Sequence, residues 1–60
     1  MKRQEIIKNL ERLGCFLKRN GGNHDIYYNP QTNKSAPIPR HKEISDSLYK
    51  LILKQLQILN

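Results

Sequence analysis

The sequence predicts an α+β domain in which a helix, three antiparallel strands and a second helix follow one another, with both helices on one face of the sheet. Apolar residues recur at helical spacing near both ends of the chain. The middle is rich in β-branched and aromatic residues, separated by Gly, Asn and Pro. Because no linker, internal repeat or low-complexity segment interrupts this order, we expect residues 1–60 to form one domain.

The first helix is expected over residues 2–13, where charged residues fill the positions between regularly spaced apolar ones. Its apolar stripe consists of Ile6, Ile7, Leu10 and Leu13. Gly14 follows directly, and a left-handed residue at this position ends a helix. In such a cap Cys15 contacts Leu10, so we expect Cys15 to be a small core residue.

A β-hairpin is expected next. Residues 15–19 are compatible with a strand, and they lead into Asn20 and Gly21, a pair typical of two-residue hairpin turns. The returning strand is expected over residues 24–28, which are rich in aromatic and branched side chains.

A third short strand is expected over residues 35–39, after a polar turn at residues 29–34. Pro37 and Pro39 have no amide hydrogen to donate to a neighbouring strand. This strand is therefore expected at an edge of the sheet.

The second helix is expected to begin after Ser45, a good N-cap, with Ile44 and Tyr49 at the spacing of a hydrophobic staple. Its apolar stripe consists of Leu48, Ile52, Leu56 and Leu59, widened by Leu51, Leu53 and Ile58. The wider stripe predicts that this helix is more buried than the first.

The charge of the chain points to a polyanionic partner. Eleven Lys and Arg against five Asp and Glu give a formal net charge of +6. The apolar runs are far shorter than a membrane-spanning helix needs, so we expect no membrane partner. The first residues continue into an amphipathic stretch rather than an apolar one, which is not typical of a secretory signal and predicts a cytoplasmic protein.

Several kinds of site are poorly supported by the sequence. A single cysteine cannot form an internal disulfide, and the serines have no base nearby in the sequence. His24 and His41, with Asp25 and Glu43, do not have the spacing of a known metal site. We therefore expect neither a metal nor a cofactor.

The candidate for catalysis is His24, which follows a glycine-rich turn and lies near Arg19. Cleaving RNA without a metal needs a base for the 2′-hydroxyl, positive charge at the phosphate and an acid for the leaving 5′-oxygen. Imidazole suits the first and third roles because it exchanges protons near neutral pH. Gly22 allows a sugar-phosphate backbone to come close to the main chain. Taken alone the signal is weak, since a histidine after a turn is more often a polar surface residue.

The other candidate residues each have a functional and a structural interpretation. Arg19 either contacts a phosphate or forms a cross-strand salt bridge with Asp25. Arg40 and Lys42 are candidates for phosphate binding, although each is also compatible with a solvated charge. His41 either supplies the catalytic acid or shapes the connection before the second helix, and the second reading is favoured.

Two segments resemble the HicA family of toxins. Residues 14–27, GCFLKRNGGNHDIY, are similar to a family pattern in which a Gly and an aromatic open the first strand, an Arg follows, and Gly-Ser-His begins the second. Residues 37–44, PIPRHKEI, are similar to the family's Val-Pro-x-His segment before the last helix. The resemblance extends over nearly the whole chain and agrees in element order.

The resemblance implies a fold like that of the double-stranded RNA-binding domain, metal-independent cleavage of mRNA, and inhibition by a cognate HicB antitoxin encoded beside the toxin. It implies that His24 is the catalytic histidine and that oligomers form through the antitoxin. Asn23 departs from the family pattern, which has Ser at this position, but its amide can also bind the turn or an RNA phosphate. The alternative is a non-catalytic RNA-binding module with the same fold.

Overall fold

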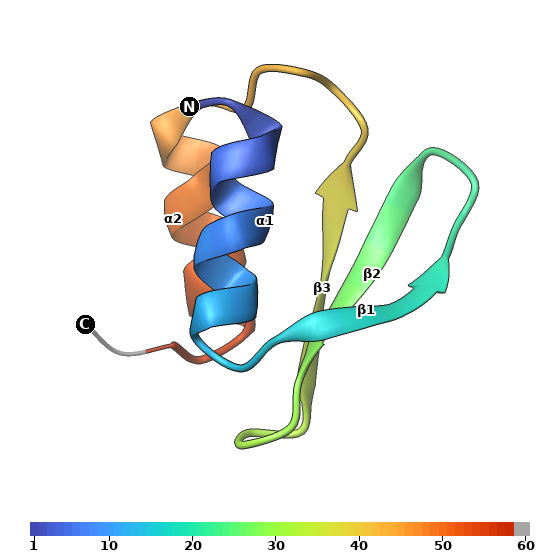
Figure 1. Ribbon diagram of the computed structural model, residues 1–60, viewed down its shortest axis with the longest axis vertical. Coiled ribbons are helices and arrows are strands. Elements are labelled where there is room, and N and C mark those ends of the chain that lie inside the picture. Colours follow the sequence, from blue (N-terminus) through green and yellow to red (C-terminus); the bar gives the residue numbers. More distant parts are fainter. Residues whose placement is uncertain (59–60) are drawn as a thin grey trace.

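The computed structural model describes residues 1–58. Its elements are, in order, α1 (Arg3–Arg12), β1 (Phe16–Asn20), β2 (His24–Asn29), β3 (Lys34–Pro39) and α2 (Asp46–Gln55). The three strands form one antiparallel sheet in the order β1-β2-β3, and Figure 1 shows both helices on the same side of it. The predicted α+β fold is confirmed, and so is the edge position of β3.

The core lies between the helices and one face of the sheet. It consists of Ile6 and Leu10 from α1, Ile52 and Leu56 from α2 and its end, Tyr27, Ala36 and Ile38 from the strands, and Cys15 and Ile44 from connections. Because successive strand residues point to opposite faces, burial of Tyr27 places His24, Ile26 and Tyr28 on the outer face, away from the helices. On that face the Tyr28 ring meets Phe16 edge-on, with ring centroids 5.5 Å apart.

The end of α1 has the predicted cap. Gly14 has a φ of 92°, Cys15 N donates to Leu10 O at 2.9 Å, and Gly14 N donates to Glu11 O at 3.0 Å. This is the hydrogen-bond pattern of a Schellman motif. Cys15 is buried as expected, although it precedes β1 rather than belonging to it. Burial raises the pKa of its thiol, which disfavours the nucleophilic thiolate.

The expected turn at Asn20 and Gly21 is wrong. Asn20 is the last residue of β1, and Gly21 N donates to His24 O at 2.7 Å, so the chain reverses over Gly22 and Asn23. A register shift between Leu17 and Arg19 inserts one extra residue into β1. With this shift Asn20 pairs with Asp25, which leaves residues 21–24 for the reversal of the chain. A Cβ atom on Gly21 would lie 2.9 Å from the His24 carbonyl oxygen, so the close approach needs glycine there.

The start of α2 agrees with the prediction, since Ser45 Oγ accepts a hydrogen bond from Leu48 N at 3.1 Å. The expectation that α2 is the more buried helix is wrong. Leu51 is 47% exposed and Ile52 is the one fully buried residue within α2, whereas α1 buries both Ile6 and Leu10. Leu59 of the predicted stripe lies outside the described residues.

The end of α2 is held by tertiary contacts that the sequence did not indicate. The Leu56 carbonyl accepts hydrogen bonds from Asn29 Nδ2 and Thr32 Oγ1, both at 2.9 Å. Gln57 takes the left-handed conformation, with a φ of 55°, and Ile58 N then donates to Leu53 O. The β2–β3 turn thereby ties the end of α2 to the sheet. Neither α1 nor α2, the helices of the described residues, has the length and apolar character of a membrane-spanning segment.

Candidate active site

His24 is exposed on the outer face of the sheet, at the first position of β2. It pairs with Pro39, the last residue of β3, so the residues that follow Pro39 lie beside it. A shallow hollow of about 410 Å³ forms at this place, lined by Gly22, Asn23, His24, Arg40 and His41. The imidazole is therefore open to a large ligand such as an RNA strand.

The hollow brings together five of the seven residues singled out from the sequence. Arg19 and Lys42 do not line it. Arg19 is exposed and pairs with Ile26, which places it on the same sheet face as His24 but outside the hollow. Lys42 lines a neighbouring groove instead.

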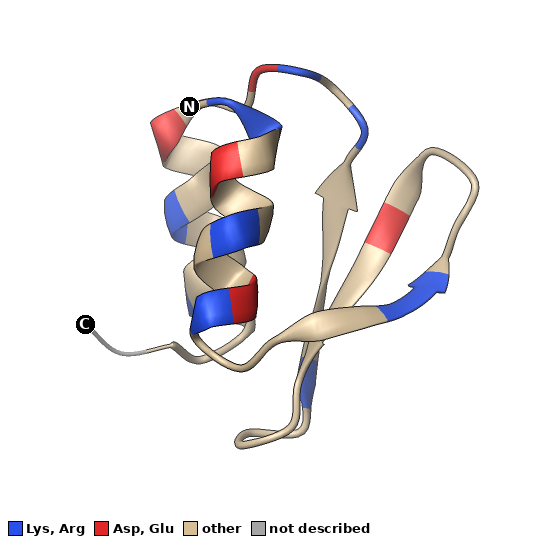
Figure 2. Ribbon diagram, in the orientation of Figure 1, with Lys and Arg blue, Asp and Glu red and all other residues tan. Residues whose placement is uncertain are grey.

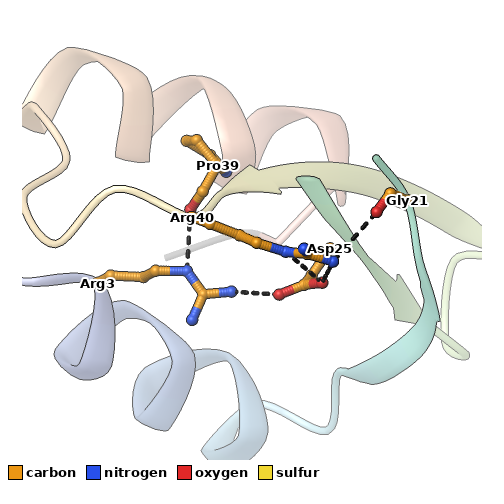
Figure 3. Close-up of polar contacts among 5 residues, drawn as sticks. All are labelled: Arg3, Gly21, Asp25, Pro39 and Arg40. Carbon is orange, nitrogen blue, oxygen red and sulfur yellow. Dashed lines mark hydrogen bonds and ion pairs between the residues drawn. The ribbon is translucent and has the colours of Figure 1, made fainter. Parts of the chain in front are cut away.

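Arg40 is held in place by three hydrogen bonds, two to Asp25 and one to Gly21. Its Nη2 atom donates to Asp25 Oδ1 at 2.8 Å and to the Gly21 carbonyl oxygen at 3.1 Å, as Figure 3 shows. Its Nε atom donates to the same Asp25 oxygen at 3.1 Å. The guanidinium thus links the bend before His24 to the connection that carries His41, and its planar fork stays oriented at the wall of the hollow.

Arg3 completes a cluster of two arginines around one carboxylate, with Asp25 between Arg3 and Arg40 (Figure 3). Arg3 Nη2 donates to Asp25 Oδ2 at 2.6 Å, and Arg3 Nε donates to Pro39 O at 2.9 Å. The proposed salt bridge between Arg19 and Asp25 is wrong, because both carboxylate oxygens are engaged by these other two arginines.

Sequence reasoning missed the roles of Asp25 and Arg3. One signal for Asp25 was available: it lies two residues before Tyr27 in β2 and therefore points to the same side of the sheet, the helix side. A carboxylate at such a position needs partners, since burying an unpaired charge is costly. No comparable signal exists for Arg3, whose approach depends on how α1 docks.

The arginine cluster shifts the ionisation of Asp25. The hydrogen bonds from Arg40 lower its pKa below the ordinary 3.8, partial burial opposes this by raising it, and the positive charges of Arg40 and Arg3 lower it further. The net direction is downward, so in the folded domain the carboxylate stays ionised to a lower pH than an ordinary aspartate does.

This shift predicts how stability depends on pH. A lowered native pKa adds stability that is present above the unfolded-state pKa, about 3.9, and is lost as the pH falls through the native value. We expect wild type to be more stable than Asp25→Asn above about pH 5, with the gap closing as the pH falls below the ordinary titration range of an aspartate. Urea unfolding of both proteins from pH 7 to 2 measures the gap. The control is Glu11→Gln, which removes an exposed carboxylate of α1, and its difference in stability from wild type should not change in this way with pH. A stability difference between wild type and Asp25→Asn that is independent of pH would contradict the prediction.

The described part of the chain contains no group of three or more His, Cys, Asp or Glu side chains placed to hold a metal ion. The groups that the hollow offers to a ligand are two imidazoles, one guanidinium, one amide and the backbone around Gly22. Such a set can exchange protons and bind an anion, which are the requirements of phosphodiester cleavage through the 2′-hydroxyl.

Comparison with curated proteins and with solved structures gives no significant match. A family model described as the HicA toxin of bacterial toxin–antitoxin systems matches residues 3–58, which spans all five elements of the fold. The match is consistent with the αβββα order and with the two segments that resemble the family. The chain therefore belongs to the HicA toxin family, the toxin side of a toxin–antitoxin pair, and a cognate antitoxin is implied as its partner.

Proposed function

We propose that this toxin cleaves mRNA without a metal ion or cofactor and that His24 is its general acid–base catalyst. The observation that carries the proposal is the exposed imidazole of His24 in one hollow with Arg40 and His41, in a chain of the HicA family. Of the seven residues singled out from the sequence, the five that line the hollow are proposed to act at the reacting phosphate. The other two are proposed to bind the RNA strand further away.

In the proposed reaction, His24 accepts the proton of a ribose 2′-hydroxyl. The 2′-oxygen forms a bond to the adjacent phosphorus, and the bond from phosphorus to the 5′-oxygen breaks. The products are a 2′,3′-cyclic phosphate and a 5′-hydroxyl, which takes up one proton. Negative charge builds on the phosphoryl oxygens meanwhile, and Arg40 is oriented at the hollow to stabilise it.

His41 is the candidate for the acid that protonates the leaving oxygen. It is exposed and lines the same hollow as His24, which favours a chemical role over the purely structural one preferred from the sequence. Two imidazoles at one phosphodiester allow one to accept a proton while the other donates.

Gly22 and Asn23 form the bend that borders the hollow. A Cβ atom on Gly22 would meet nothing within 4 Å, so open space lies beside the main chain where the strand has to approach. The Asn23 amide takes the place of the family's serine and offers both a donor and an acceptor to a phosphate or to the bend. Arg19 and Lys42 lie outside the hollow and are proposed to bind more distant phosphates.

The test is the chemistry of the products. Purified protein incubated with mRNA and EDTA should yield fragments with cyclic phosphate and 5′-hydroxyl ends, and a substrate with 2′-deoxyribose at the cut position should survive. The second candidate, a non-catalytic RNA-binding module, predicts salt-sensitive binding without strand scission. Intact RNA under these conditions, with binding retained, would favour that module.

The proposed partner is a HicB-like antitoxin that covers the hollow and its basic surroundings, with oligomers forming through the antitoxin. Expression of the toxin should arrest growth, and co-expression of an antitoxin encoded beside it should relieve the arrest. If the antitoxin relieved the growth arrest but left His24 accessible to RNA in the complex, this would contradict the proposal that it inhibits by covering the hollow.

A further inference from the structure

A second hollow, larger than the one at His24, lies where the start of α1 meets the β3–α2 connection. It has a volume of about 490 Å³ and is lined by Lys2, Arg3, Gln4, Arg40, Lys42 and Glu43; we call it the basic groove. Figure 2 shows basic segments of α1 and of the β3–α2 connection at this same end of the molecule.

Backbone contacts hold the two walls of the basic groove together. Arg3 N donates to Lys42 O at 2.8 Å, Ile44 N donates to Met1 O at 2.8 Å, and Lys2 and Glu43 pair as an antiparallel bridge. The backbone positions from which the groove side chains extend are therefore defined before any ligand binds. Preorganised cations are effective anion ligands because little ordering is needed on binding.

The charges of the basic groove are unevenly neutralised. Four cationic side chains face one carboxylate, that of Glu43. Arg3 and Arg40 share the Asp25 carboxylate, whereas Lys2 and Lys42 are exposed and form no salt bridge with any residue in the 1–58 range. These two lysines are the ones free to bind an external anion.

The basic groove lies next to the hollow at His24. Arg40 lines both hollows, and the Asp25 carboxylate joins it to Arg3 of the groove. A phosphodiester placed at His24 therefore has its strand neighbours within reach of the groove cations.

We propose that the basic groove binds backbone phosphates of the RNA strand next to the cleavage position, with Lys2 and Lys42 as the principal ligands. The inference rests on the proposed function, because it takes the reacting phosphate to lie at His24. The strand cut at His24 then continues past Arg40 and over the start of α1.

The lining of the basic groove favours a phosphate backbone over a docked protein. Protein interfaces are centred on apolar and aromatic anchors, whereas nucleic-acid backbones are bound by Lys and Arg. The large apolar side chains exposed on the described surface are Leu13, Phe16, Leu17 and Leu51, and none of them lines the groove.

The experiment compares two double variants that lose the same charge. Lys2→Ala/Lys42→Ala removes the two groove lysines, and Lys34→Ala/Lys50→Ala removes two exposed lysines that line neither hollow. Binding is measured over a range of salt with RNA whose 2′-hydroxyls are all methylated, so that no strand is cut. Thermal unfolding confirms that both variants fold, and cleavage of ordinary mRNA is followed in parallel.

We expect the groove variant to weaken binding by about tenfold and to reduce the slope of log Kd against log salt by about 1.4, or about 0.7 for each lost phosphate contact. The control variant should keep the wild-type slope. Equal losses in both variants would show that net charge alone matters and would overturn the inference while leaving cleavage at His24 intact. Groove substitutions that spare RNA binding but weaken capture of the antitoxin would also overturn it, by making the groove a protein site. Wild type that neither binds nor cuts RNA would remove the proposed function and this inference together.

Discussion

The His24→Ala protein is expected to fold as wild type does and to cut RNA about 10² to 10⁴ times more slowly, the usual contribution of one general acid–base group. Folding should persist because His24 is exposed and makes no side-chain hydrogen bond to another described residue. Single-turnover cleavage of a fluorescent RNA gives the rate, and thermal unfolding gives the stability.

His41→Ala is the companion variant, since it removes the other imidazole of the same hollow, the one proposed as the acid. If His41 is the acid, wild type has a bell-shaped dependence of rate on pH and His41→Ala loses one limb of the bell. Unchanged cleavage by the His24→Ala protein would remove the assignment of His24 as the catalyst, whatever His41→Ala does.

Leu10→Ala is expected to lower the free energy of unfolding by about 2 to 5 kcal/mol, as other buried leucine truncations do. Leu10 is 0% exposed and contributes to the core between α1, α2 and the sheet. Domains have about 0.05 to 0.15 kcal/mol of stability per residue, so a loss of this size removes a large share of what a 60-residue chain possesses. Urea unfolding followed by circular dichroism measures the change.

Leu13→Ala is the control for Leu10→Ala, because it makes the same truncation at the end of the same helix. Leu13 is 43% exposed, and we expect its truncation to cost less than about 1 kcal/mol. Comparable losses for Leu10→Ala and Leu13→Ala would mean that the described packing of α1 is incorrect.

The features that sequence analysis predicted well depend on neighbouring residues. The Schellman cap at Gly14 and the Ser45 cap of α2 follow from a few adjacent side chains and their backbone preferences. The edge position of β3 follows from its two prolines. Leu13 and Leu51 belong to predicted apolar stripes and are nevertheless exposed, because periodicity does not say where a neighbouring element stops covering a helix.

The candidate site was predictable in part for the same reason. The bend around Gly22, Asn23 and His24 is contiguous, so its residues could be named together. Their association with Arg40 and His41 depends on the pairing of His24 with Pro39, which is non-local. The resemblance to the HicA family rests on residues 14–27 and 37–44, but it did not indicate that residues from both segments line one hollow.

The order of the elements, the caps at Gly14 and Ser45 and the basic composition of the chain could be read from the amino-acid sequence, because each of these depends on local conformation or on composition. Tertiary structure alone decided that Asp25 pairs with Arg3 and Arg40 rather than with Arg19. It also decided that Asn29 and Thr32 hold the end of α2 and that Lys2 faces the β3–α2 connection across the basic groove. These contacts join residues far apart in the chain, and their partners are chosen by packing and strand register, which no local preference specifies.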